Sequence, residues 1–263
     1  MTASTSVRLH DDISKNSINS IKLRKLSNPQ PLSSLSNRKS QDALKKLVDE
    51  LIILFVESQQ LGTDDNRITQ LILDCIESRN QDANEVLKWL ISNQHSLSYK
   101  TLLGYFYFHD IGTEIETRKA YISYLAAAKK DYPIAQYLLG ECYSSGMGTK
   151  TDEKLAFQWY QKAAEGGCSN GLNWLGYCYE FGKGTEKDIH KAFTYYKKST
   201  RQGNKLGMHF LADCYEKGKG TQKNIDQAIY WYRKSTESGH EGSLTVLNKL
   251  LKATNSPPLQ LEN

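Results

Sequence analysis

A pattern that repeats every 36 residues constrains the fold of this 263-residue chain more than any other feature. The pattern is clearest at three sets of equivalent positions, which we call columns. In each unit a small residue, a tyrosine and a glycine recur in the same order at the same spacing. They are Gly104, Gly140, Gly176 and Ala212, then Tyr107, Tyr143, Tyr179 and Tyr215, then Gly112, Gly148, Gly184 and Gly220. Four units follow one another without an insertion, which indicates an array of one supersecondary element.

Each unit has the hydrophobic pattern of two α-helices. Ala135, Leu139 and Cys142 of the second unit are spaced at i, i+4 and i+7, so they fall on one face of a helix. Later in the same unit, the segment DEKLAFQWYQKAAEGG places Ala156 and Tyr160 on one face of a second helix. One such pair cannot bury its own apolar face, and we therefore expect neighbouring units to stack into a solenoid.

A glycine-rich corner separates the two helices. In the third unit it reads Gly-Lys-Gly-Thr from Gly182, but it lacks the glycine that a phosphate-binding loop needs five residues earlier. Similar corners recur in all four units, and glycine is typical of the left-handed conformation that follows a helix. Asp152, Asp188 and Asn224 come after the corners at positions that predict N-caps for the second helices.

The pattern resembles the Sel1-like repeat, a relative of the tetratricopeptide repeat. The residues that carry the resemblance lie in AQYLLGECYSSGMGT, GLNWLGYCYEFGKGT and GMHFLADCYEKGKGT, with a degenerate copy in YKTLLGYFYFHDIGT. Its departures are Asp110 in place of a corner glycine, and threonine after the corner where the family often has valine. The resemblance implies an all-α fold, a right-handed superhelical α-solenoid of helix-turn-helix repeats with a helical N-terminal cap.

Composition and periodicity divide the chain into four parts. Residues 1–40 are rich in serine and basic residues without periodicity, which predicts a disordered tail. Residues 41–97 contain three segments with helical spacing, which we interpret as a helical N-terminal cap, with a separate small helical domain as the alternative. Residues 98–252 form the array of four repeats with a C-terminal capping helix, and residues 253–263 are expected to be a flexible tail.

The net charge of +5 is confined to the N-terminal tail. Residues 1–40 hold seven Lys and Arg against two Asp, which leaves 27 of the 34 basic and 27 of the 29 acidic residues for the rest of the chain. A neutral array argues against nucleic acid binding. The longest apolar run, residues 51–56, is too short for a membrane span, and we find no secretory signal, so we expect a cytoplasmic protein.

Three of the five cysteines, Cys142, Cys178 and Cys214, occupy one column of the repeat. Equivalent helices in a stack lie roughly 8–10 Å apart, which exceeds the reach of a disulfide. We expect these thiols to be reduced, buried and inert. The cysteines and the six histidines show no metal-ligand spacing, so we predict no metal site and no cofactor.

One segment of the N-terminal tail has the spacing of a regulatory site. Arg24 precedes Ser27 by three residues and Pro29 follows it by two, which is similar to a basophilic kinase site that becomes a 14-3-3 ligand when phosphorylated. Ser27 is therefore a candidate phosphosite, with 14-3-3 as a candidate partner. An ordinary basic tail is the alternative interpretation.

The face of each first helix that lies opposite its core is the candidate binding surface. By resemblance to tetratricopeptide arrays, this face lines a concave groove that holds a partner protein or peptide. The candidate residues are Tyr105, Phe108, Tyr137, Glu141, Asn173, Tyr177, Glu180, His209, Asp213 and Glu216. Aromatic groups lie toward one end and an acidic patch of Glu180, Asp213 and Glu216 toward the other, which suits a partner with an apolar anchor and a basic stretch. The alternative is that these are ordinary solvated positions.

The resemblance implies an interaction scaffold or adaptor, because Sel1-like arrays serve in signalling and complex assembly. A narrower alternative is a regulatory activator subunit of an enzyme such as a protein kinase or chitin synthase. We do not expect catalysis, since the Cys-rich Sel1-like proteins described as hydrolases carry paired cysteines in each repeat, whereas this chain carries one core cysteine per repeat. His209 and Asp213, at i and i+4, are interpreted as surface side chains and not as an acid–base pair.

Overall fold

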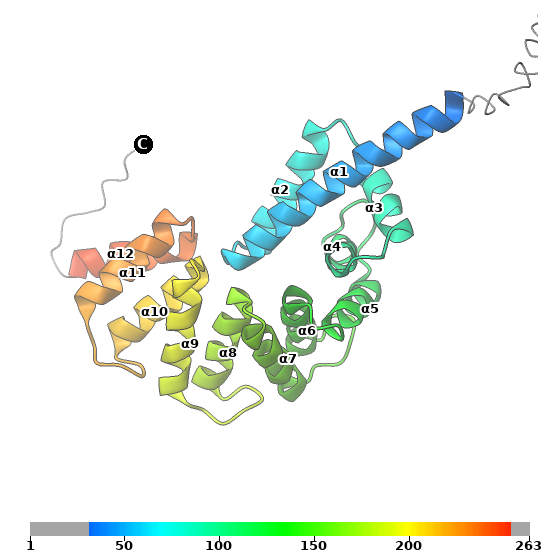
Figure 1. Ribbon diagram of the computed structural model, residues 1–263. Coiled ribbons are helices and arrows are strands. Elements are labelled where there is room, and N and C mark those ends of the chain that lie inside the picture. The colour runs from blue at the N-terminus through cyan, green and yellow to red at the C-terminus, as the bar shows by residue number, and fades with distance from the viewer. Residues whose placement is uncertain (1–31, 254–263) are drawn as a thin grey trace, which may run out of the picture. The chain divides into compact units, whose positions relative to one another are not determined.

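The structure is a computed structural model that describes residues 32–253, which form twelve α-helices and contain no strand (Figure 1). The all-α class expected from the sequence is confirmed. The chain forms two compact units, residues 1–43 and residues 44–263. Of the first unit, the described residues are the first turns of α1 (Leu32–Gln60). This helix begins inside the stretch that the sequence assigns to a disordered tail.

Three helices precede the repeats: α1, α2 (Asp65–Ser78) and α3 (Ala83–Ser92). Buried apolar side chains recur at helical spacing in α1 and α2, namely Leu44, Leu47, Val48, Leu51, Phe55, Ile68, Ile72 and Ile76. They belong to one hydrophobic core that continues into the repeats as far as Cys178. A shared core favours the interpretation of these helices as a cap over that of a separate domain.

The repeats are four pairs of helices, followed by a single helix. The pairs are α4 (Leu97–Phe108) with α5 (Thr117–Ala128), α6 (Pro133–Ser145) with α7 (Glu153–Glu165), α8 (Ser169–Phe181) with α9 (Ile189–Arg201), and α10 (Lys205–Lys217) with α11 (Ile225–Glu237). In Figure 1 they follow one another along an arc. The last helix, α12 (Glu241–Ala253), buries Leu247 and Leu251 in a cluster with Tyr232 of the fourth repeat. The solenoid of helix-turn-helix repeats is confirmed.

Each corner uses its two glycines for different reasons. Gly182 ends α8 in the left-handed conformation, with a φ of 72°. Gly184 also has a positive φ, 69°, and a Cβ atom there would lie 2.0 Å from the carbonyl oxygen of Glu153 in the preceding repeat. The backbone of the corner therefore docks on the start of α7, and the Gly-Lys-Gly-Thr segment is a packing element.

The predicted N-caps are confirmed in the last three repeats. Asp152, Asp188 and Asn224 each accept a hydrogen bond of 2.9 Å, through the side-chain Oδ1, from the main-chain N–H three residues later. These bonds satisfy amide groups that have no partner within their own helix. The start of α7, α9 and α11 is thus encoded locally.

A buried tyrosine joins the two helices of every repeat. Tyr124, Tyr160, Tyr196 and Tyr232 are each at most 2% exposed. The ring of Tyr160 lies so close to Gly140 on the facing helix that a Cβ atom on this glycine would be 2.6 Å from it. A larger residue would separate the helices, which explains why the small-residue column and the tyrosine column recur together.

The repeated cysteines are buried in the core, as the sequence predicts. Cys142, Cys178 and Cys214 are at most 3% exposed, and all are free thiols. Burial raises the pKa of each thiol to about 12. They therefore stay protonated at neutral pH and act as packing groups, since the thiolate is the reactive form.

Candidate interaction surface

The corner between α1 and α2 lies against the start of the third and fourth repeats. The Ser169 hydroxyl donates a hydrogen bond of 2.5 Å to the main-chain carbonyl of Gln60. The main-chain N–H of Lys205 donates one of 3.0 Å to the carbonyl of Leu61. Carbonyl groups at the end of a helix lack partners within it, and these donors supply them. We call these contacts the clasp, formed by residues 59–62 with Ser169, Asn170, Asn204 and Lys205.

Buried amide side chains complete the clasp. Asn170 Nδ2 donates to Gln59 Oε1 at 2.9 Å, and Asn204 Nδ2 donates to Asn170 Oδ1 at 2.8 Å. All three side chains are at most 4% exposed. Sequence reasoning missed the clasp, although Asn170 carried a signal: it is polar where the equivalent residues Ile134 and Leu206 are apolar.

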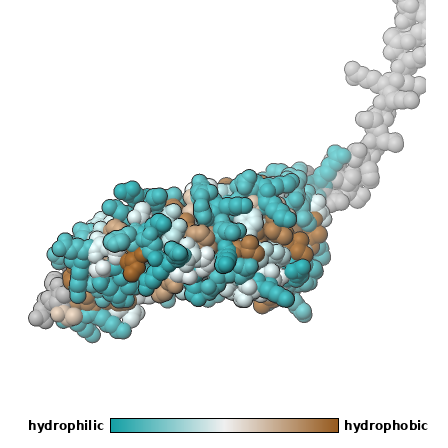
Figure 2. Space-filling view, turned by 90° about the horizontal axis from the view of Figure 1, so that it is seen from below, coloured by the Kyte–Doolittle hydropathy of each residue, from teal (hydrophilic) through white to brown (hydrophobic). Residues whose placement is uncertain are grey.

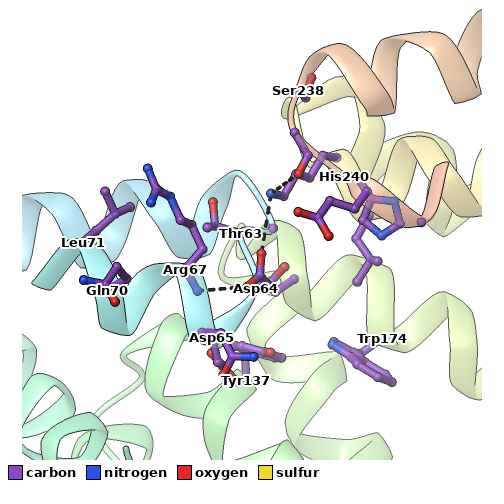
Figure 3. Close-up of a pocket in the computed structure, with 18 of the residues that line it drawn as sticks. Thr63, Asp64, Asp65, Arg67, Gln70, Leu71, Tyr137, Trp174, Ser238 and His240 are labelled. Carbon is purple, nitrogen blue, oxygen red and sulfur yellow. Dashed lines mark hydrogen bonds and ion pairs between the residues drawn. The ribbon is translucent and has the colours of Figure 1, made fainter. Parts of the chain in front are cut away.

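A groove of about 980 Å³ lies between the start of α2 and the turn before α12. Figure 3 shows the side chains of α2 on one side and Ser238 and His240 on the other. The aromatic side chains that line it are Tyr137 and Trp174, and the charged ones are Asp64, Asp65, Glu141, Glu241, Arg67 and Lys205. Four carboxylates against two cations make the groove acidic. Two of these lining residues, Tyr137 and Glu141, are among the ten candidates proposed from the sequence.

The ten residues proposed from the sequence differ in burial. Four are buried, namely Tyr105, Tyr137, Asn173 and Glu180. Six are half-buried, namely Phe108, Glu141, Tyr177, His209, Asp213 and Glu216. Their role in partner binding stays a prediction. Some of them line the groove, whereas others contact residues of the protein itself.

Two of the buried candidates are covered by the protein itself. Tyr105 is 0% exposed, packs on Phe55 with ring centroids 4.9 Å apart, and donates a hydrogen bond of 2.9 Å to the carbonyl of Asp65. Asn173 is also 0% exposed, and neither atom of its amide group has a hydrogen-bond partner among the described residues. Neither side chain is accessible to a partner in this conformation.

The predicted acidic patch is neutralised within the fold. Lys219 Nζ lies 2.5 Å from Glu180 Oε1 and 2.7 Å from Asp213 Oδ2. The Tyr196 hydroxyl donates a second hydrogen bond to Glu180, at 2.8 Å. In the same way, Glu216 accepts one of 2.8 Å from Tyr232. The charges of Glu180 and Asp213 are therefore largely unavailable to a basic partner, whereas among the described residues Glu216 has a hydrogen bond but no cation partner.

His209 does not pair with Asp213. Its Nδ1 lies 2.8 Å from the Ser243 hydroxyl of α12, while Asp213 is ion-paired with Lys217 and Lys219. Burial lowers the pKa of His209. His209 is half-buried and forms a contact between the fourth repeat and α12, whereas the sequence had predicted a surface side chain.

Two other carboxyl groups, Glu141 and Asp65, form no ion pair with a lysine or arginine among the described residues. Both border a small recess of about 30 Å³, together with Phe108, Tyr137 and Met147. Glu141 accepts a hydrogen bond from the Tyr160 hydroxyl, and burial raises its pKa to about 7. The pKa of Asp65 is also raised, mainly by reduced solvation and to a lesser extent by the negative charge of Asp64, although half of the Asp65 side chain is exposed. Sequence reasoning missed Asp65 because it lies outside the repeats.

Three aromatic side chains of α8 form a continuous row, which we call the aromatic strip: Trp174, Tyr177 and Phe181. The ring centroids of Trp174 and Tyr177 are 5.3 Å apart, and those of Tyr177 and Phe181 are 4.6 Å apart. Phe181 is 51% exposed. The strip starts in the groove, because Trp174 lines it, and ends at an exposed phenylalanine ring.

Figure 2 shows the hydropathy of one face of the molecule. It is mainly hydrophilic, and its hydrophobic atoms lie in small separate groups. Large continuous apolar patches are typical of docking surfaces. No large continuous apolar patch is visible on this face.

Several sequence predictions concern features that the described residues do not show. Ser27 lies outside them. Residues 32–253 contain no group of His, Cys, Asp and Glu side chains arranged to hold a metal ion. They also contain no helix that is long and apolar enough to cross a membrane.

Comparison with known families follows the repeat boundaries closely. The model of the Sel1 repeat matches residues 100–132, 133–168, 169–204 and 205–240, which together are more than half of the chain. The chain belongs to the Sel1 repeat family. The first match shows that the degenerate unit with Asp110 at its corner is a true Sel1 repeat. Sel1 repeat proteins generally mediate protein–protein interactions and are typically non-catalytic scaffolds.

Solved structures of other Sel1 repeat proteins share this fold. A Sel1 repeat protein from Oxalobacter formigenes is 28% identical with a TM-score of 0.61, over 66% of this chain and 73% of that one. A protective antigen of uropathogenic Escherichia coli strains, which displays the same fold, is 22% identical with a TM-score of 0.58, over 88% of this chain and 54% of its own. Among curated proteins, none matches the sequence.

Proposed function

We propose that this Sel1 repeat protein is an adaptor that captures a partner protein through the aromatic strip and the adjoining groove. The observation that carries the proposal is the exposure of Phe181 at the end of a row of aromatic rings that contact one another. Aromatic side chains supply much of the binding energy in protein interfaces. The three rings lie on one helix and already contact one another, so binding would order few additional side chains.

The groove beside the strip supports the proposal with polar groups. It holds four carboxylates and two cations around Tyr137 and Trp174, and a few polar groups in an aromatic setting are typical of specific recognition sites. A regulatory subunit of an enzyme would use the same surface, because capture of the enzyme is its first step. Signalling or complex assembly is accordingly the proposed setting.

The test compares partners captured from native cells by the full chain and by two variants. The double variant Tyr177→Ala, Phe181→Ala shortens the strip at half-buried and exposed positions, so its fold should persist. The matched control is Tyr230→Ala, which removes an aromatic side chain that is 48% exposed on α11. We expect the double variant to lose specific partners that the control keeps. The same partners in all three samples would contradict the proposal.

A further inference from the structure

We propose that the recess between Asp65 and Glu141 receives the ammonium group of a lysine side chain from the partner protein. This inference rests on the proposed function, since the recess and the groove share Asp65, Tyr137 and Glu141 as walls. A partner segment that lies in the groove can therefore extend a side chain into the recess.

The first argument is the missing charge. Among residues 44–253, neither Asp65 nor Glu141 forms an ion pair with a lysine or an arginine. The nearest basic group is His109, whose Nε2 lies 4.0 Å from Asp65 Oδ2. Burial lowers the pKa of His109 to about 4, so it is neutral at pH 7. The two neighbouring carboxylates lack the cation that would stabilise their ionised forms.

The second argument is a comparison between repeats. Asp213 of the fourth repeat is equivalent to Glu141 of the second, and it is neutralised by Lys219 at 2.7 Å. The residue equivalent to Lys219 in the second repeat is Met147, and Met147 lines the recess. In the fourth repeat the chain supplies its own lysine to the carboxylate at this position. In the second repeat it places an apolar methionine there instead. The recess is thus a carboxylate site without its lysine.

The third argument is size and surroundings. A volume of about 30 Å³ holds a group the size of a water molecule. An ammonium group is compact, whereas the guanidinium of arginine is a larger planar fork. Phe108, Tyr124 and Tyr137 border the recess, and aromatic rings stabilise nearby cations. These features select lysine over arginine and over an uncharged side chain.

The binding test uses a short probe and a methionine signal. The probe is the acetylated and amidated peptide Gly-Ser-Leu-Lys-Leu-Ser-Gly, with matched peptides in which arginine or norleucine replaces lysine. Each is titrated into the full chain labelled with ¹³C at the methyl groups of its three methionines. We expect the lysine peptide to shift the Met147 signal in a saturable way and the norleucine peptide to leave it unchanged. Equal affinity for the arginine or the norleucine peptide would overturn the proposal.

Four variants locate the effect. Glu141→Gln and Asp65→Asn should each weaken the lysine peptide by about tenfold, since each removes one charge of the pair. Glu141→Gln still offers an oxygen to the Tyr160 hydroxyl, so its fold should persist. The control Glu186→Gln removes an exposed carboxylate from a corner and should change nothing. Met147→Lys places a lysine in the recess and should block the peptide, measured by fluorescence anisotropy of a labelled probe.

Failure of this inference is separable from failure of the adaptor function. If Tyr177→Ala, Phe181→Ala loses the cellular partner but Met147→Lys and Glu141→Gln retain it, the strip binds the partner and the lysine assignment is wrong. If the strip variant also retains every partner, the adaptor surface itself is wrong. Loss of the partner in Met147→Lys, with unchanged thermal stability, supports the lysine assignment.

Discussion

The hydroxyl group of Ser169 donates a hydrogen bond to the main-chain carbonyl of Gln60, which lies 109 positions earlier in the chain. Ser169 is 0% exposed and begins α8, whereas Gln60 ends α1. The bond ties the N-terminal cap to the middle of the array. The cap therefore reaches well beyond the first repeat, and the third and fourth repeats depend on it for buried hydrogen bonds.

We predict that Ser169→Ala weakens the clasp. Removing the hydroxyl leaves a buried carbonyl acceptor without this donor, which lowers the free energy of unfolding by about 1–3 kcal/mol. Urea denaturation measures this loss, and hydrogen exchange should show faster exchange of the Lys205 amide, which is bonded to Leu61. The control is Ser123→Ala, because its hydroxyl bonds only to the Lys119 carbonyl of its own helix. Equal effects of the two substitutions would show that the clasp adds no stability.

We predict that two glycines with the same backbone conformation differ in their tolerance of alanine. Gly167 has a φ of 84° and nothing within 4 Å of an added Cβ, so Gly167→Ala should cost only the left-handed strain, about 1–2 kcal/mol. Gly184→Ala should cost more, since its Cβ would also collide with the Glu153 carbonyl. Thermal denaturation of both variants measures the difference. A smaller loss for Gly184→Ala would refute the docking of the corner on the preceding repeat.

We predict that two lysines at equivalent positions in successive repeats differ in importance. Lys219 bridges Asp213 and the buried Glu180, so Lys219→Met leaves a buried carboxylate without its cation and should cost about 2 kcal/mol. Lys183 pairs with Glu153 at the surface, where both side chains are about half exposed, so Lys183→Met should have no measurable effect. Urea denaturation compares them. Adding Glu180→Gln to Lys219→Met should restore part of the loss.

We predict that the docking of α12 weakens as the pH falls. The Ser243 N–H donates to His240 Nδ1 at 3.1 Å, which requires a neutral imidazole. Burial, then the neighbouring His209, lowers the pKa of His240 to about 4 from an ordinary value of 6.5. A lowered pKa means that the stabilisation is complete above pH 6.5 and is lost as the pH falls toward 4.

Thermal denaturation between these pH values measures the effect on α12. His240→Asn offers an uncharged N-cap and should flatten the pH dependence. Glu237→Gln, which removes an exposed carboxylate near the same turn, is the control and should leave the dependence unchanged. An identical pH profile for His240→Asn and the unsubstituted chain would exclude His240 as the titrating group.

Local patterns account for the parts of the fold that the sequence predicts correctly. The corner at Gly182, the N-cap at Asp188 and the packing of Tyr160 on Gly140 each depend on residues close in sequence or on exact repetition. Helical spacing and capping chemistry are short-range, so one chain is enough to read them. The start of α1 at Leu32 was not predicted, because the stretch before residue 41 shows no apolar periodicity.

The candidate site depended on longer-range contacts. Spacing alone placed Tyr105 and Glu180 on a free face, but Phe55 covers the first and Lys219 neutralises the second. It gave no reason to bring Asp65 beside Glu141, since one lies in the cap and the other in the second repeat. The sequence by itself determined the repeat, its helices and its core columns. Only the tertiary structure decided which carboxyl groups of the groove lack a lysine or arginine partner within the described part of the chain, because burial and charge pairing depend on segments distant in the chain.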